Sequence, residues 1–251
     1  LKVKGDYTEL NFEHCKYPEI NVIADTTMKM SKNVKDYLNQ IEKERMIRQE
    51  FFSNASHELK TPITSIQGYA ELLESGMIQD EATKADFASR IKKEAVRMTG
   101  LINDILMISR LEAKEAEVTF SDVRISVLLE EIVDSLKPQA AEAQVFLHVD
   151  CQPIMIHANL QQMRELITNL ISNAIKYNRP GGQVWINVRE TDGQMVLRVR
   201  DNGVGIPSDS LDRIFERFYR VDKGRSRKQG GTGLGLSIVK HIVNFYHGTI
   251  H

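Results

Sequence analysis

A long helical pattern begins near Ser31. Its apolar residues recur at alternating steps of three and four, which is the spacing of a helix that packs along a partner helix. Arg45 and Arg48 interrupt the series. The series contains Val34, Leu38, Ile41, Phe52, Ala55, Leu59, Pro62, Ile66, Tyr69 and Leu73. We therefore predict a long helix with one covered seam.

A second amphipathic helix is expected after a turn. Gly76 and the polar residues 79–81 favour the turn, and an apolar face then continues to about Leu111. That face contains Phe87, Ile91, Ala95, Met98, Ile102 and Ile105. Because two antiparallel helices bury little surface alone, the pattern favours two hairpins paired into a four-helix bundle. The alternative is a monomeric hairpin packed on its own neighbouring domain.

The periodicity changes after Glu112. Residues 113–122 are polar and predict a hinge, and the rest mixes helical and strand patterns. Helices are expected over residues 127–136 and 160–177, and strands over 145–149, 153–156, 183–189 and 194–200, with a hairpin turn at Asp192-Gly193. Helices alternating with antiparallel strands predict an α/β sandwich, in which one sheet carries its helices on one face.

Composition narrows the functional classes. The 251 residues are 41% hydrophobic, enough for two modest cores, and the net charge of −1 argues against nucleic-acid binding. Cys15 and Cys151 lack the spacing of a disulfide framework or a zinc site, so we expect reduced thiols in a cytoplasmic protein portion. No apolar run approaches the roughly 20 residues of a transmembrane helix.

The segment SHELKTP contains a candidate nucleophile. His57 falls off the apolar seam and should face solvent, while Glu58 can orient its imidazole or accept its proton. Thr61 lies one helical turn beyond His57 on the same face. Pro62 removes a backbone donor and should bend the helix, although a purely structural kink would use the same residue.

Two further segments suit a nucleotide. Asn169, Asn173, Lys176 and Tyr177 share one face of the helix predicted over residues 160–177, although asparagine is a mediocre helix former. The glycine-rich run at residues 230–236 opens another helix, so its free amides can cradle phosphates. Its spacing matches neither a P-loop nor the dinucleotide fingerprint.

These segments, with DNGVGI at 201–206 and FERFYR at 215–220, occur in a fixed order. Together they resemble the sensor histidine kinases of two-component signalling over roughly residues 31–251. The resemblance implies a dimerising phosphoacceptor hairpin followed by an ATP-binding domain of the type shared with gyrase and Hsp90. It also implies that His57 is phosphorylated from ATP with Mg²⁺, and that the phosphoryl group passes to an aspartate of a separate response regulator.

The resemblance also assigns roles to individual residues. Asn173 would hold Mg²⁺, Asp201 would accept a hydrogen bond from the adenine amine, and Glu58 with Thr61 would support a phosphatase reaction on the regulator. Arg220, in a predicted lid between Ile206 and Gly230, would stabilise phosphoryl charge. The full set of expected nucleotide-binding residues is Asn169, Asn173, Lys176, Tyr177, Asp201, Gly203, Gly205, Ile206, Arg220, Gly231, Thr232, Gly233, Leu234, Gly235 and Leu236.

Four domains are expected. Residues 1–30 resemble the second half of a HAMP relay, residues 31–113 form the phosphotransfer hairpin, residues 114–122 the hinge, and residues 123–251 the ATP-binding domain, cut short at its end. A HAMP relay normally follows a transmembrane helix, so membrane attachment would come only from segments upstream. We expect a homodimer, a response-regulator partner and a location on the cytoplasmic side of a bacterial membrane.

Three alternative functions remain open at this point. An ATP-driven clamp of the gyrase or chaperone class would share Asn173, Asp201 and the glycines but would not need His57 on a dimerising helix pair. A scaffold without turnover would be expected to carry a broken motif, and none is broken. A protein that acts mainly as a phosphatase is favoured by Glu58 and Thr61 and is compatible with kinase activity in the same chain.

Overall fold

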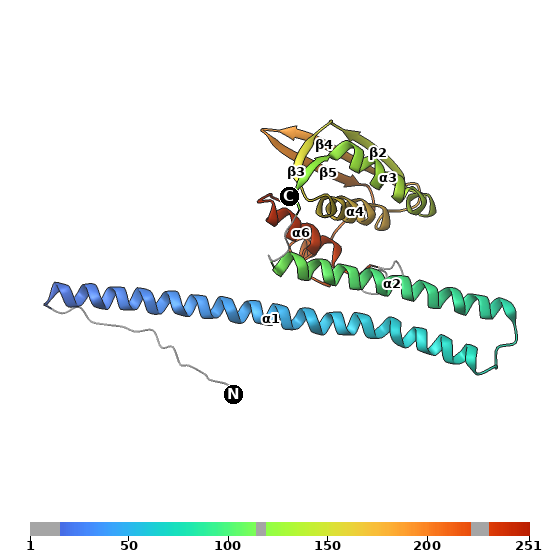
Figure 1. Ribbon diagram of the computed structural model, residues 1–251, viewed down its shortest axis with the longest axis horizontal. Coiled ribbons are helices and arrows are strands. Elements are labelled where there is room, and N and C mark those ends of the chain that lie inside the picture. Colours follow the sequence, from blue (N-terminus) through green and yellow to red (C-terminus); the bar gives the residue numbers. More distant parts are fainter. Residues whose placement is uncertain (1–15, 114–118, 222–230) are drawn as a thin grey trace. The chain divides into compact units, whose positions relative to one another are not determined.

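The computed structural model describes residues 16–113, 119–221 and 231–251 (Figure 1). Two compact units are distinguished, residues 1–56 and residues 57–251. The elements are, in order, α1 (Pro18–Glu74), α2 (Glu81–Ala113), β1 (Ser121–Arg124), α3 (Ile125–Glu142), β2 (Phe146–Cys151), β3 (Met155–Ala158), α4 (Leu160–Lys176), β4 (Gln183–Thr191), β5 (Gln194–Asp201), the 3-10 helix η1 (Ser208–Ser210) and α6 (Gly235–Phe245).

Helix α1 begins at Pro18, earlier than the start predicted near Ser31. Proline at the first helical position and Glu19 in the first turn both suit a helix N-terminus. In the first unit the seam residues Val34 and Leu38 stay 42% and 37% exposed, which leaves this part of the seam open to another helix. Residues 1–15 lie outside the described part, and the HAMP-like assignment of residues 1–30 stays a prediction.

The predicted turn between the two helices is confirmed. Asp80 precedes α2 and caps it, because the Thr83 N–H donates to Asp80 Oδ2 at 2.9 Å and the Ala82 N–H donates to Oδ1 at 3.3 Å. Hydrogen bonds from the Thr83 side chain and backbone lower the pKa of the Asp80 carboxyl. The rings of Tyr69 and Phe87 lie 5.1 Å apart and join the two helices near the turn.

The strands of the second unit form two small sheets. One has the order β2-β4-β5, and the other pairs β1 with β3. The β4-β5 hairpin is antiparallel and turns at Asp192 and Gly193, whose φ values of 53° and 74° are those the predicted turn requires. The sheet is mixed, however, because β2 runs parallel to β4, and the prediction of antiparallel strands alone is wrong there. Chain order explains this, since the crossover through β3 and α4 returns the chain in the same direction.

Strand β1 had no counterpart in the predicted elements. Its four residues are too few to display an alternating pattern, and only Val123 is buried. It begins at Ser121, so residues 121 and 122 of the predicted hinge lie in a strand, whereas residues 114–118 lie outside the described part. Asp122 of β1 pairs with His157 of β3 at 3.0 Å.

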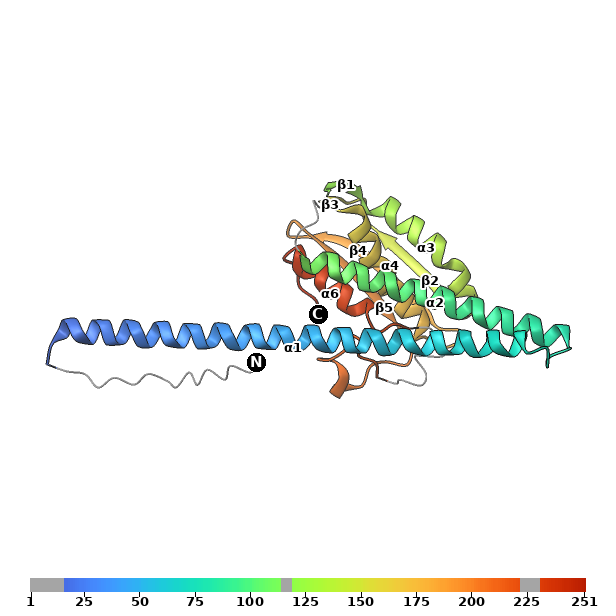
Figure 2. The same cartoon turned by 60° about the horizontal axis from the view of Figure 1, so that its bottom comes forward.

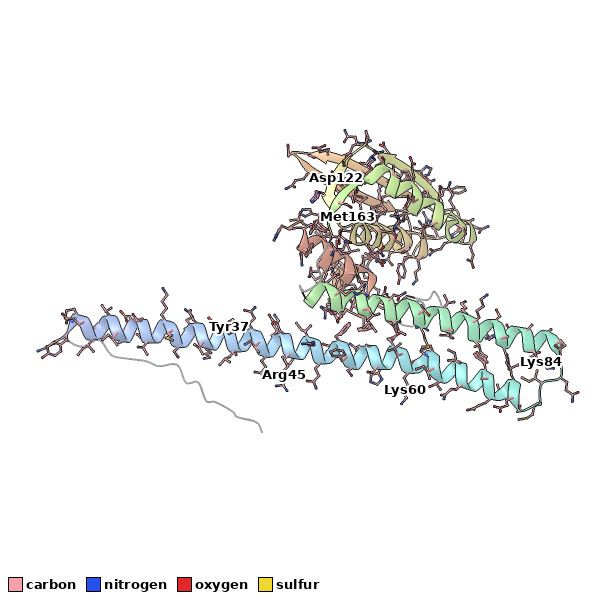
Figure 3. All side chains as sticks on the ribbon, in the orientation of Figure 1. Tyr37, Arg45, Lys60, Lys84, Asp122 and Met163 are labelled. Atoms are coloured by element: carbon pink, nitrogen blue, oxygen red, sulfur yellow. The ribbon has the colours of Figure 1, made fainter. Side chains whose placement is uncertain are left out.

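The core of the second unit lies between one face of the sheet and its helices (Figures 1 and 2). Along β4, Val184, Ile186 and Val188 are buried while Trp185 between them is 37% exposed, so one face packs inward as predicted. Helix α4 contacts β4, β5, α3 and α6. Figure 3 shows Met163 of α4 within this core and Lys60 projecting outward from α1.

No helix in the described part of the chain is both long and apolar enough to cross a bilayer.

Candidate active site

His57 lies on an exposed position of α1, as its place off the apolar seam predicts. The Thr61 hydroxyl, one turn further along, donates to the His57 backbone carbonyl at 3.3 Å, which fixes it on the same side of the helix. Helix α1 continues through Pro62, which is buried and has no N–H to donate to the carbonyl of Glu58. The imidazole is therefore accessible on an ordered helix.

Glu58 contacts both α2 and the segment that precedes the glycine-rich loop. Its Oε2 accepts a hydrogen bond from Arg220 Nη2 at 3.0 Å and lies 3.5 Å from Arg97 Nη2 on α2. The Arg220 side chain is only 4% exposed, and its Nε is buried with no hydrogen-bond partner among the described residues. A buried, unpaired guanidinium donor is costly, which indicates that this position awaits an anionic ligand.

The polar face of α4 meets the glycine-rich loop. A Cβ at Gly235 would lie 2.5 Å from Asn169 Oδ1, and one at Gly231 would lie 2.6 Å from Lys176 Nζ. Both distances are shorter than real Cβ contacts, so a larger residue at either position would require the Lys176 or Asn169 side chain to move. The Asn169 amide donates from Nδ2 to the Glu165 carbonyl at 2.9 Å, which holds its oxygen toward the loop. Asn173 stands between these two residues on α4 and is half-buried.

Asp201 ends β5 at the side of the same helix. Its Oδ1 accepts from the Gly203 N–H at 2.9 Å, and the Val204 N–H donates to the Tyr177 carbonyl at 3.1 Å. Asn202 anchors this turn to the sheet, since its Oδ1 accepts from the Gln183 N–H at 2.7 Å. The loop is therefore tied to the end of α4, and within the part of the chain that the structure describes Asp201 Oδ2 accepts no hydrogen bond. Gly205 and Ile206 follow on the exposed side of the turn.

The surroundings of Lys176 change its pKa. Burial, with the nearby charges of Arg220 and Arg97, lowers the pKa of the Lys176 ammonium to about 8. Both effects disfavour the charged form of Lys176. The phosphates of a nucleoside triphosphate would counter them, so the residues present fit such a ligand.

The same residues suit magnesium held mainly by phosphates. The described residues contain no group of three or more histidine, cysteine, aspartate or glutamate side chains able to hold an ion by themselves. Mg²⁺ keeps several waters and is commonly bound by one protein oxygen together with substrate phosphates. The amide oxygen of Asn173 is suited to that single contact.

Comparisons with known proteins give a consistent assignment. Residues 158–251 match the family described as histidine kinase-, DNA gyrase B- and HSP90-like ATPase, and residues 47–114 match the His Kinase A (phospho-acceptor) domain. The chain is 39% identical over 213 residues to a sensor protein kinase WalK of Staphylococcus saprophyticus, covering 84% of this chain and 34% of that protein. A WalK of Staphylococcus aureus is 37% identical over 213 residues and is covered to 51%.

The chain belongs to the sensor histidine kinases of two-component systems. It spans about one third of the length of the S. saprophyticus relative. Solved structures agree with the fold. Full-length ShkA in complex with AMPPNP has a TM-score of 0.56 at 27% identity, covering 78% of this chain and 40% of that one. The histidine kinase ThkA in complex with the response regulator TrrA has a TM-score of 0.62 at 21% identity, covering 84% and 61%.

The structure of this family member brings most of the predicted residues together, but it adds three that the sequence did not indicate. Arg97, Asp104 and Asn202 contact predicted site residues or their loops. Asn202 lies inside the DNGVGI motif and could have been found there, but Arg97 and Asp104 are ordinary polar positions of a helix in the sequence. The basic residues of the predicted lid, Lys223 to Lys228, lie outside the described part.

Nucleotide binding is expected to be roughly tenfold weaker at about pH 9 than at neutral pH. At neutral pH most Lys176 side chains are charged, whereas at about pH 9 only about a tenth would remain so. The depressed pKa sets the sign, since the ammonium loses its proton as the pH rises through about 8. Calorimetric titration with ADP across this range measures the effect. Lys176→Met should bind weakly at every pH, and Lys137→Met, at an exposed lysine of α3, serves as the control. A Met variant whose profile runs parallel to the original chain would show that Lys176 is not the titrating group.

Proposed function

We propose that the chain transfers the γ-phosphoryl group of ATP to its own His57 and then to an aspartate of a separate response regulator. The observation that carries this proposal is the Glu58–Arg220 bond of 3.0 Å. It joins the neighbour of the exposed histidine to an arginine of the ATP-binding half, 162 residues later in the chain. A nucleotide whose γ-phosphate reached Arg220 would therefore lie beside the helix that carries His57.

The first step follows from the side chains present. An imidazole nitrogen of His57 attacks the γ-phosphorus, the new P–N bond forms as the P–O bond to the β-phosphate breaks, and ADP leaves with that electron pair. The phosphorylated ring then releases its other N–H proton, and Glu58 is placed to accept it. Lys176 and Arg220 would balance the phosphate charge, and positioning of this kind supplies most of the rate in phosphoryl transfer.

When bound, magnesium would neutralise part of the charge of the phosphates. Asn173 is the residue proposed to hold it, with Asn169 beside it toward the glycine-rich loop. Asp201 is proposed to read the adenine amine, and Tyr177 to pack along the base. Gly203, Gly205 and Ile206 would line the base side, whereas residues 231–236 would line the phosphates.

The partner proposals rest on the hairpin. Apolar residues of its helices stay largely exposed, which favours pairing with a second copy into a four-helix bundle. They include Phe52 at 56%, Ile63 at 43% and Leu106 at 49% exposure. ThkA, a protein of similar fold, has been solved with a response regulator, and we propose a partner of the same kind for this chain. Hydrolysis of the phosphorylated regulator with the help of Glu58 and Thr61 is a further proposal.

We also place this portion on the cytoplasmic side of a membrane, anchored through segments upstream. The HAMP-like pattern of residues 1–30 supports this location. The proposed boundaries remain those expected from the sequence, with the hairpin over residues 31–113 and the ATP-binding domain over residues 123–251. An ATP-driven clamp is not favoured, because it would not need a histidine-bearing dimerisation hairpin.

The test is incubation of the chain with γ-³²P-ATP and Mg²⁺, followed by treatment of the labelled protein with acid and with alkali. A phosphohistidine is lost in acid and survives alkali, so label with this behaviour is the expected result. ATP hydrolysis without any labelled protein would instead support the clamp.

A further inference from the structure

A carboxylate of the hairpin holds the glycine-rich loop. Asp104 lies on α2 between Leu101 and Ile108, whose side chains are 4% and 0% exposed, on the part of α2 that contacts α6. Its Oδ2 accepts a hydrogen bond from the Thr232 hydroxyl at 2.8 Å. Figure 1 shows α2 running beside α6, at whose N-terminus the loop ends.

The contact reaches the backbone of the loop. The Thr232 Oγ1 that donates to Asp104 also accepts from the Leu234 N–H at 3.2 Å. Leu234 is fully buried and precedes the first residue of α6. This N–H is one of the amides expected to face phosphates at the helix N-terminus. While Thr232 is held by Asp104, the Leu234 amide is directed to the threonine hydroxyl and not to a ligand.

The buried position of Asp104 on α2 disfavours the charged form of its carboxyl. Burial raises the pKa of the Asp104 carboxyl to about 6, the Thr232 bond opposes this rise, and the charge of Glu165 on α4 adds to it. Because the Thr232 bond lowers the pKa, the hydroxyl binds the charged carboxylate more strongly than the protonated acid. The contact is therefore strongest above about pH 6 and weakens as the pH falls through that value.

We propose that Asp104 is a positioning residue for the nucleotide loop: it holds Thr232 against α2 in the nucleotide-free arrangement and must release it when phosphates bind. The loop can then be held by Asp104 or bound to phosphate, but not both at once. Each interaction therefore weakens the other by the same factor. The inference rests on the proposed function of the loop as a phosphate site. It assigns to the hairpin a direct influence on nucleotide affinity.

Two substitutions at this residue are expected to raise nucleotide affinity to different extents. Asp104→Ala removes the acceptor and frees the loop, so nucleotide affinity should rise about fivefold, the worth of one net hydrogen bond. Asp104→Asn keeps an oxygen that can accept from Thr232 but has no charge, so it should hold the loop more weakly than the carboxylate and equally at every pH. Near neutral pH its affinity should lie between those of the original chain and Asp104→Ala.

The experiment is a calorimetric titration of the whole chain with ADP and with a non-hydrolysable ATP analogue between about pH 5.5 and pH 8. The affinity of the original chain, divided by that of Asp104→Asn, cancels the titration of the nucleotide itself. This ratio should fall as the pH rises, because only the original chain gains a charged acceptor for Thr232. Asp86→Ala and Asp86→Asn, at an exposed aspartate on the same helix, are the controls and should leave affinity unchanged. Hydrogen exchange at the Leu234 amide should be fastest in Asp104→Ala, slowest in the original chain and intermediate in Asp104→Asn.

An affinity of Asp104→Ala that is unchanged or lower than that of the original chain would overturn the proposal, as would a pH-independent ratio. These measurements need no phosphoryl transfer. A chain that binds nucleotide but never labels itself would therefore refute the proposed function while leaving the role of Asp104 decided by the same titration.

Discussion

Replacing His57 with glutamine is expected to abolish ATP-dependent labelling of the chain. Glutamine is polar and of similar size, and at this exposed position of α1 it should leave the helix intact. It has no ring nitrogen able to form a P–N bond with the γ-phosphorus. Labelling with γ-³²P-ATP should therefore fall to background, whereas the affinity for ADP should stay that of the original chain.

The matched control is His157→Gln. His157 is also exposed and lies on β3, where it pairs with Asp122, so its loss should reduce labelling little. Equal labelling of the original chain and the His57→Gln variant would place the phosphoacceptor elsewhere. Loss of label together with loss of ADP binding would indicate a folding defect, which circular dichroism of the variant would detect.

Replacing Asp201 with asparagine is expected to weaken ATP binding by roughly a hundredfold. The variant keeps an oxygen to accept from the Gly203 N–H, so the turn after β5 should survive. Its amide nitrogen, however, would stand where a carboxylate oxygen is proposed to accept from the adenine amine. Two donors would then face each other, and a lost bond to a charged group with an unpaired partner costs about 3 kcal/mol.

Asp192→Asn is the control for this change. Asp192 also lies in a turn that contains a glycine, but at the exposed tip of the β4-β5 hairpin. Titration of both variants with ATP and GTP should show that only Asp201→Asn loses its preference for ATP. An unchanged preference in that variant would contradict the assignment of Asp201 to the base.

The positions of the helices and of the local turns were predictable because short-range physics decides them. The heptad seam of α1, the turn at Gly76 and the hairpin at Asp192-Gly193 each depend on neighbours only a few residues away. The sheet was predicted less well. The parallel pairing of β2 with β4 depends on where the crossover through β3 and α4 returns the chain, and the short β1 carries too little pattern to be recognised.

Some residues of the candidate site could likewise be predicted from the sequence, and others could not. His57, Asn169, Asn173, Asp201 and the glycines stand in segments whose residue types already indicate their chemistry. Arg97 and Asp104 do not, because a charged residue on an amphipathic helix is normally a solvated one. Their roles follow only from packing, which places Arg97 3.5 Å from Glu58 and Asp104 2.8 Å from Thr232 across 128 residues of chain.

The sequence by itself determined the family, the order of the hairpin and the ATP-binding half, and the identity of the proposed nucleophile, since these depend on local periodicity and on residue types at fixed spacing. Only the tertiary structure decided which hairpin carboxylates meet which nucleotide groups. Asp104 meets Thr232 because α2 packs on α6, and Glu58 of α1 meets Arg220 in the segment before α6. Burial also sets the proton affinities of Lys176 and Asp104, because desolvation is a property of the folded surroundings and not of the residue.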